Sequence, residues 1–184
     1  LDAEIGLVVT ALEAHNLLED TLLIITSDHA MGFEQLQRVP LLVRFPGGEN
    51  SGRVHENVQG LDIAPTILDY LELPQPAWMS GRSLLAEAAE QRYIFGVGVG
   101  PLALNENGIW ATDPQRSHPP FYQFGTINVF DCQVWYELDL VEHTLTQGEA
   151  SGYIEPCPEE EVLISDEAYE LMVGFLRENG FEVE

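Results

Sequence analysis

The sequence predicts an α/β fold, and three features of the chain carry this prediction. An apolar run ends abruptly in Asp28 and His29, an amphipathic helical pattern precedes it, and a second apolar run follows it. A run that is apolar on both faces is typical of a strand in a parallel sheet covered by helices. Ligands and catalytic groups collect at the carboxyl ends of such strands, so Asp28 and His29 are candidate functional residues.

The first elements follow from local patterns. Residues 1–18 predict a helix, because Ile5, Val9 and Leu12 recur on one face at helical spacing. Asn16 is suited to end this helix, since asparagine tolerates the left-handed conformation. The run that begins at Thr21 and the run at 39–45 then predict two strands.

A second helix and a set of short strands complete the prediction. Asp62 is placed to cap a helix that reaches Leu71, with Pro65 in its first turn. Ser165 or Asp166 is placed to cap a last helix that runs through Arg177, with Gly180 after its end. The remaining apolar stretches predict short strands at 93–99, 108–111, 126–130 and 134–138. The alternating glycines at 96–100 favour a strand with close backbone contacts over a phosphate-binding loop, because no Lys-Ser/Thr ending follows them.

Charge narrows the class of function. The chain has 31 acidic residues against 7 basic ones, a formal net charge of −24, and no lysine at all. Binding to a phosphate backbone needs basic patches, so nucleic acid is excluded as a partner. No apolar stretch approaches the roughly 20 residues of a membrane span. The composition suits a soluble protein, a salt-tolerant one, or one that gathers cations.

The two cysteines and the first residue leave more open. Cys132 and Cys157 could form one disulfide in an oxidising compartment or remain free thiols, and the sequence favours neither. The chain begins at Leu1 rather than at Met, directly on a helical pattern. We therefore expect it to be an excised piece of a longer protein.

Several segments together resemble the C-terminal part of the sulfatase family, within the alkaline phosphatase superfamily. They are Thr-Ser-Asp-His at 26–29, Arg-Val-Pro-Leu-Leu-Val-Arg-Phe-Pro-Gly-Gly at 38–48, Leu-Asp-Ile-Ala-Pro-Thr-Ile-Leu at 61–68 and Gly-Arg-Ser-Leu-Leu at 81–85. The resemblance implies the C-terminal portion of an alkaline-phosphatase-like α/β sandwich at residues 1–88. A small antiparallel β subdomain with a terminal helix would follow at residues 89–184.

The resemblance also implies a metal site. Asp28 and His29 match family positions that bind a divalent metal, with calcium as the first candidate and manganese or zinc as alternatives. A hard cation needs carboxylate oxygen and stabilises the charge that builds on an anionic ester. The alternative is that Asp28 caps the loop and His29 packs against the sheet edge. Asp62 matches a family aspartate taken as a helix cap, and His55 is either a supporting group of the site or a surface residue.

Departures from the family pattern limit what this chain can do alone. The family nucleophile lies in a Cys/Ser-x-Pro-x-Arg motif, which this sequence lacks, and Ala30 stands where the family usually has glycine. Asp28 and His29 offer at most three ligand atoms, whereas a hard cation takes about six or more. We therefore expect weak metal binding by this chain and no competent hydrolase activity.

Two classes of function follow. The first is the C-terminal part of a metal-dependent hydrolase of sulfuric or phosphoric esters, whose substrate would be an anionic ester. The second is a non-catalytic, degenerate module kept for binding or assembly. In either case, a sheet without its preceding strands has an exposed edge, which predicts self-association. The resemblance also suggests a periplasmic or extracellular location.

Overall fold

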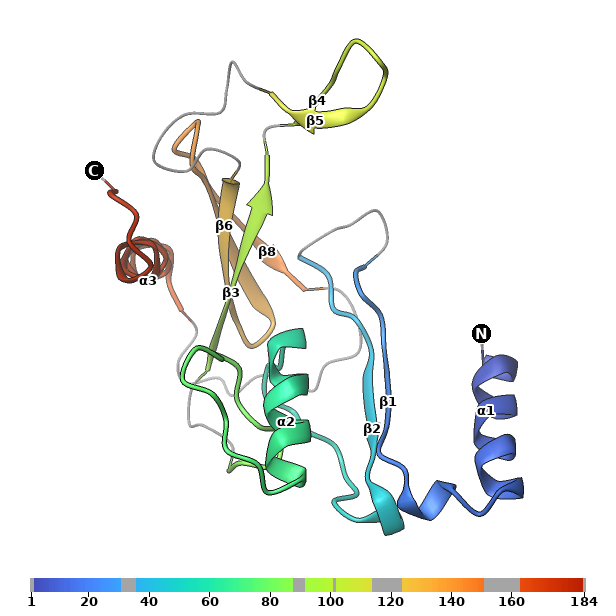
Figure 1. Cartoon of the computed structure of the whole chain (residues 1–184). Coiled ribbons are helices and arrows are strands. Elements are labelled where there is room, and N and C mark those ends of the chain that lie inside the picture. The colour runs from blue at the N-terminus through green and yellow to red at the C-terminus, as the bar shows by residue number, and fades with distance from the viewer. Residues whose placement is uncertain are drawn as a thin grey trace. The chain divides into compact units, whose positions relative to one another are not determined.

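The structure is a computed structural model that describes residues 2–30, 36–87, 92–100, 102–113, 124–150 and 163–183. It has a mixed α/β architecture, with antiparallel sheets and a C-terminal helix (Figure 1). The chain divides into two compact units. One comprises Leu1–Glu34 and Arg38–Val54, and the other comprises Gln35–Gln37 and His55–Glu184.

The first unit begins with the predicted helix, α1 (Asp2–Ala14). Asn16 ends it in the left-handed conformation with a φ of 56°. The amides of Asn16 and Leu17 donate to the carbonyls of Glu13 and Leu12, which is the hydrogen-bond pattern of a Schellman motif. No residue of α1 is buried, and the side chain of Leu7 is 70% exposed.

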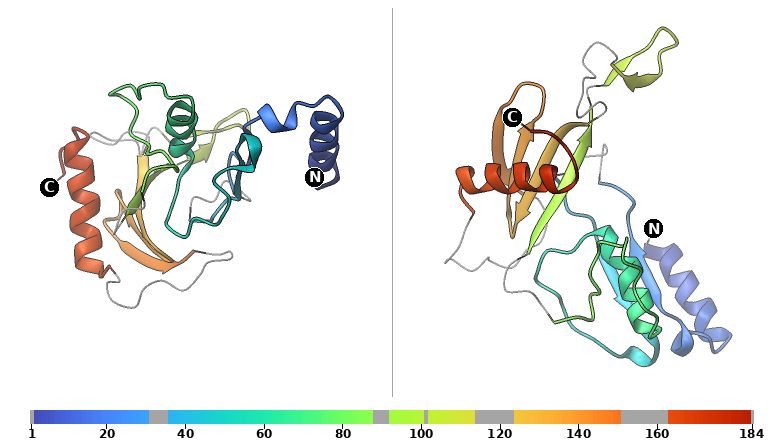
Figure 2. Two further views of the ribbon diagram at one scale, coloured as in Figure 1. Left: turned by 90° about the horizontal axis from the view of Figure 1, so that it is seen from below. Right: turned by 60° about the vertical axis from the view of Figure 1, so that its left-hand side comes forward.

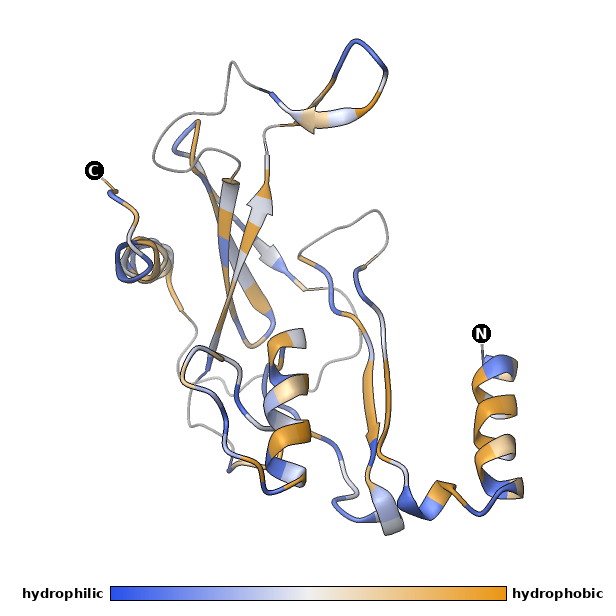
Figure 3. Ribbon diagram, in the orientation of Figure 1, coloured by the Kyte–Doolittle hydropathy of each residue, from blue (hydrophilic) through white to orange (hydrophobic). Residues whose placement is uncertain are grey.

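The two predicted strands form an antiparallel pair, which corrects the parallel arrangement expected for the first of them. β1 (Leu23–Thr26) pairs with β2 (Leu41–Arg44), so that Leu23 lies opposite Arg44 and Thr26 opposite Leu41. In the described part of the chain this sheet has two strands, and none of the β1 residues is fully buried. The apolar run of β2 is visible in Figure 3. A strand that is apolar on both faces can pair with a parallel or an antiparallel neighbour. The apolar run therefore did not show which direction the neighbouring strand takes.

Arg44 ties the far end of this strand pair to the short 3₁₀ turn η1 (Leu18–Asp20). Its Nη1 donates to the carbonyl of Leu18 at 2.7 Å, and its Nη2 donates to Oε1 of Glu19, also at 2.7 Å. A second 3₁₀ turn, η3 (Pro46–Gly48), follows β2. The Asp28–His29 end of the pair is therefore the end opposite this anchor.

The second unit begins with η4 (Gly60–Asp62) and α2 (Ile63–Tyr70), close to the helix predicted from Asp62 to Leu71. It continues into a four-stranded antiparallel sheet with the order β3–β6–β7–β8. The strands are β3 (Tyr93–Val99), β6 (Phe124–Asp131), β7 (Val134–Asp139) and β8 (Leu145–Glu149), and β4 (Leu102–Leu104) and β5 (Trp110–Thr112) form a separate hairpin. β4 and β8 were not predicted, and β8 was missed because it is mostly polar.

The core lies between this sheet and α3 (Ser165–Glu178), which covers one face of it (Figure 2). The N-cap of α3 differs from the prediction of Ser165 or Asp166, since Ile164 occupies that position and Ser165 is already helical. The rings of Phe95 on β3 and Phe175 on α3 stack at 4.4 Å between centroids. The fully packed residues of this core are Ile127, Val129, Tyr136, Leu138, Leu140, Leu163, Ala168, Met172 and Leu176. Among the described residues, no helix is both long and apolar enough to cross a membrane.

Candidate metal centre

The candidate ligands Asp28 and His29 lie directly after β1, in the connection that leads toward β2. The hydroxyl of Ser27 donates to the carbonyl of His29 at 2.7 Å, and the amide of His29 donates to Oδ1 of Asp28 at 3.1 Å. These two local hydrogen bonds shape the loop. The second hydrogen bond is a capping contact of Asp28 within its loop, as the alternative to metal binding expects. It uses Oδ1 of Asp28 and leaves Oδ2 for another partner.

Oδ2 of Asp28 lies 3.6 Å from Nε2 of His29. The side chain of Asp28 is 86% exposed and that of His29 is 43% exposed, so both are accessible from solvent. A metal ion binds carboxylate oxygen and imidazole nitrogen at about 2.0–2.4 Å. Two donor atoms at 3.6 Å can therefore both reach one ion.

The other ring nitrogen of His29, Nδ1, forms a hydrogen bond that shows where one proton of the ring lies. Nδ1 lies 2.8 Å from the carbonyl oxygen of Ala30. Because a carbonyl oxygen only accepts hydrogen bonds, Nδ1 carries a proton. In the neutral ring, Nε2 then presents a lone pair toward Oδ2 of Asp28, which is how metal-bound histidines are commonly oriented. A doubly protonated ring would instead form an ion pair with Asp28.

These residues fit part of a metal site rather than a whole one. Within the described ranges, no group of three or more His, Cys, Asp or Glu side chains is placed to hold a metal ion. Asp28 and His29 supply two ligand side chains, and calcium takes six to eight oxygen ligands. Any further protein ligands would have to come from outside the described residues.

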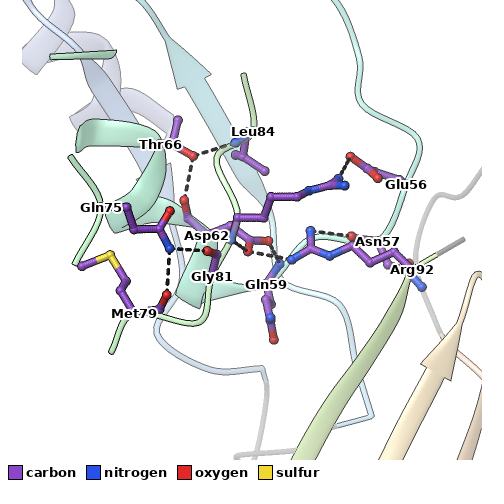
Figure 4. Close-up of polar contacts among 11 residues, drawn as sticks. Glu56, Asn57, Gln59, Asp62, Thr66, Gln75, Met79, Gly81, Leu84 and Arg92 are labelled. Carbon is purple, nitrogen blue, oxygen red and sulfur yellow. Dashed lines mark hydrogen bonds and ion pairs between the residues drawn. The ribbon is translucent and has the colours of Figure 1, made fainter. Parts of the chain in front are cut away.

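Asp62, predicted as a helix cap, takes part in a capping box at the start of η4 rather than capping α2 itself, and it also binds Arg92. It stands at the N-cap position of α2, but its side chain makes no capping hydrogen bond to that helix. Its Oδ2 accepts from the amide of Gln59 at 2.8 Å, and its Oδ1 accepts from the amide of Arg82 at 2.9 Å and from Nη2 of Arg92 at 2.7 Å (Figure 4). The side chain of Asp62 is 0% exposed and that of Arg92 is 13% exposed.

Hydrogen bonds and burial have opposite effects on the pKa of Asp62, and the hydrogen bonds have the larger effect. Burial raises the pKa of the Asp62 carboxyl. Hydrogen bonds from Arg92 and from the amides of Arg82 and Gln59 lower this pKa, and so does the charge of Arg92. Together these lowering effects exceed the effect of burial. The net pKa lies below its ordinary value, so Asp62 is ionised at neutral pH. It is a buried anchor rather than a proton donor.

Arg92 is the residue of this network that sequence reasoning missed. It is one of only 7 basic residues in the chain, and it directly precedes the apolar run of β3. An arginine at the start of an apolar run is a signal that the sequence offers. The sequence does not show its partner, because Asp62 lies 30 residues earlier. His55, the other singled-out residue near this segment, has an exposed side chain.

Comparison with known proteins supports the resemblance to the sulfatase family. The family described as N-sulphoglucosamine sulphohydrolase, C-terminal, matches residues 26–94. Arylsulfatase K of Bos taurus is 38% identical over 101 residues, a match that covers 48% of this chain and 19% of that protein. An extracellular sulfatase SULF-1 homolog of Drosophila melanogaster is 36% identical over 98 residues, covering 46% of this chain and 9% of that protein. These matches identify residues 26–94 as similar to the C-terminal region of the sulfatase family.

A solved structure shares the fold of this chain. Phosphonate monoester hydrolase SpPMH from Silicibacter pomeroyi superposes with a TM-score of 0.66 at 20% sequence identity, and the match covers 97% of this chain and 38% of that chain. The likeness supports the α/β fold predicted from the sequence. The residues matched by the family include Asp28, His29, Asp62 and Arg92.

Proposed function

We propose that this chain contributes part of the metal site of a sulfatase-like hydrolase that acts on anionic esters. The observation that carries the proposal is the convergence of Oδ2 of Asp28 and Nε2 of His29, 3.6 Å apart, within the segment matched by the family. The chain spans 19% of the length of arylsulfatase K of Bos taurus, so most of such an enzyme would lie outside it. In such an enzyme, residues 1–88 would form the C-terminal portion of the α/β core, and residues 89–184 would form the small antiparallel β subdomain.

Asp28 and His29 would act by holding and orienting the ion. Asp28 offers Oδ2 while its Oδ1 accepts the amide of His29, so the carboxylate is held to the loop. His29 offers Nε2 while Nδ1 donates to Ala30, so the ring is held in one orientation. The bound metal would supply positive charge that stabilises the negative charge developing on the ester oxygens. Calcium is the first candidate, and manganese or zinc are the alternatives that an imidazole ligand permits.

The chemical step needs a nucleophile that this sequence does not supply. It contains no Cys/Ser-x-Pro-x-Arg segment. The isolated chain should therefore bind metal weakly and hydrolyse neither aryl sulfates nor aryl phosphates. Hydrolysis by the purified chain, abolished by Asp28→Ala, would contradict this part of the proposal.

Calorimetric titration of the whole chain with calcium, manganese and zinc tests the metal site. Asp28→Ala should lose the heat of binding that the unmodified chain shows. Asp20→Ala is the matched control, because it removes an exposed carboxylate from the same unit, eight positions earlier in the chain. Equal heats for the unmodified chain and for Asp28→Ala would remove the metal claim. They would favour the non-catalytic alternative.

Location and assembly are proposals of the same kind. We infer an extracellular or periplasmic location, supported by the likeness to an extracellular sulfatase homolog and by a disulfide at Cys132. We also infer self-association. β1 and β2 pair only with each other in the described chain, and Leu42 on β2 is 57% exposed. Light scattering at high protein concentration should give more than the mass of one chain, and a strictly monomeric mass would contradict the inference.

A further inference from the structure

The side chain of Arg92 connects the four-stranded sheet to the segment that precedes α2. Arg92 directly precedes β3, and Tyr93, the first residue of β3, pairs with Asp131 at the end of β6. Nη2 of Arg92 donates to Oδ1 of Asp62 at 2.7 Å, and its Nη1 donates to the carbonyl of Asn57 at 3.2 Å (Figure 4). One side chain at the start of β3 therefore holds two points of the chain before α2.

A second contact runs from the same segment to the turn between β6 and β7. Cys132 is one of the two residues of this turn, and its carbonyl accepts from Nδ2 of Asn57 at 3.0 Å. Because Tyr93 pairs with Asp131, both contacts lie at the same end of the sheet. Asn57 is 9% exposed and Asp62 is 0% exposed, so water competes little for these hydrogen bonds.

The segment that they hold, residues 57–84, is itself tied together around Asp62, and we call it the α2 segment. Oγ1 of Thr66 donates to the carbonyl of Asp62 at 2.6 Å and accepts from the amide of Leu84 at 2.9 Å. The amide of Arg82 donates to Oδ1 of Asp62 at 2.9 Å. Asp62 therefore lies at the centre of the α2 segment and also receives the bond from Arg92.

The apolar core of the sheet does not include the α2 segment. Among the described residues, the core and the partly buried side chains packed against it come from the sheet, from α3 and from residues that flank them, and none comes from residues 57–84. α3 packs against β6, β7 and β8, whereas α2 packs against η4. The polar contacts of Arg92 and Asn57 are therefore the connection that the structure shows between these two parts.

We propose that Arg92 and Asn57 form a polar joint that couples the α2 segment to the four-stranded sheet, so that both unfold as one cooperative unit. The residues matched by the family end at 94, so the joint connects this region to β6, β7 and β8, which lie beyond it. Where an apolar core does not extend from one part into another, hydrogen bonds supply the free energy that couples them, and bonds to buried charged groups supply the most. This role is independent of the proposed hydrolase function.

Amide hydrogen exchange of the whole chain, measured over a series of denaturant concentrations, tests the joint. In the unmodified protein, the amides of residues 67–70 in α2 and of Ile127 and Val129 in β6 should exchange through one shared opening with the same dependence on denaturant. Asn57→Ala removes the bond to Cys132. Exchange in α2 should then become at least about fivefold faster than exchange in β6, through a smaller opening of its own.

Two further variants sharpen the test. Arg92→Lys keeps a positive charge beside Asp62, but an ammonium group lacks the fork that reaches two acceptors, so its addition to Asn57→Ala should widen the difference. Gln75→Ala is the matched control. Nε2 of Gln75 donates to the carbonyls of Met79 and Gly81 at 2.7 and 2.9 Å, which are bonds within the α2 segment. This variant should leave α2 and β6 coupled.

Three results would overturn the proposal. Independent exchange of α2 and β6 in the unmodified protein would show that the two parts are not coupled. A shared opening that persists when Asn57→Ala and Arg92→Lys are combined would show that the coupling lies elsewhere. Equal separation by Gln75→Ala and by Asn57→Ala would show that any local weakening of the α2 segment has this effect. If a variant fails to fold, exchange in the unmodified protein decides the matter by itself.

Discussion

Asp62→Asn is the substitution whose effect can be worked out most fully. It keeps the size of the side chain but removes the charge that faces Arg92. Both carboxylate oxygens of Asp62 accept backbone amides, so the new amide group must point at an N–H donor of either Gln59 or Arg82. A hydrogen bond to a charged group contributes about 1.5–3 kcal/mol, and a buried donor left unsatisfied costs about 1–3 kcal/mol. The variant should therefore lose about 3–5 kcal/mol, as expected for a broken buried ion pair.

Chemical denaturation followed by circular dichroism measures this loss as a lower midpoint with the slope unchanged. Glu19→Gln is the matched control. It also neutralises the acidic partner of an arginine, but Glu19 is 70% exposed, so its loss should cost less than about 1 kcal/mol. If the two variants were destabilised equally, or if Asp62→Asn fell within about 1 kcal/mol of the unmodified chain, the assigned role of Asp62 would be refuted.

Three further predictions concern pH, packing and salt. The lowered pKa of Asp62 means that its contribution to stability is present above the unfolded value of about 3.9 and is lost as pH falls below it. The stability difference between the unmodified chain and Asp62→Asn should therefore shrink as pH falls below about 4 and through the lowered folded-state pKa, in acid titrations of unfolding. Gly148→Ala should destabilise by about 1–3 kcal/mol, because the new methyl would meet the Trp135 ring. Gly174→Ala in α3 meets nothing and should be neutral or stabilising in the same denaturation assay. Raising salt from about 0.1 M to about 1 M should raise the melting temperature, since screening relieves the repulsion of a net charge of −24. A melting temperature that salt leaves unchanged would argue against that repulsion.

The sequence alone predicted the three helices, most of the strands and the resemblance to the sulfatase family. Helical spacing placed α1, α2 and α3 within a few residues, and Asn16 ended α1 in the left-handed conformation as predicted. Four ordered motifs indicated the sulfatase family, which comparison with known proteins then confirmed. These inferences succeeded because helix periodicity, capping and turn chemistry act between residues that are close along the chain.

Only the tertiary structure decided which residues meet. It showed that β1 pairs antiparallel with β2, and that Asp62 binds Arg92 instead of capping α2. It also showed that the turn at Cys132 binds Asn57 in the loop before η4. A local pattern sets the conformation of its own residues, but it does not say which distant donor satisfies a buried carboxylate or which strand lies alongside. Those choices depend on how all the buried groups of the folded chain are satisfied together.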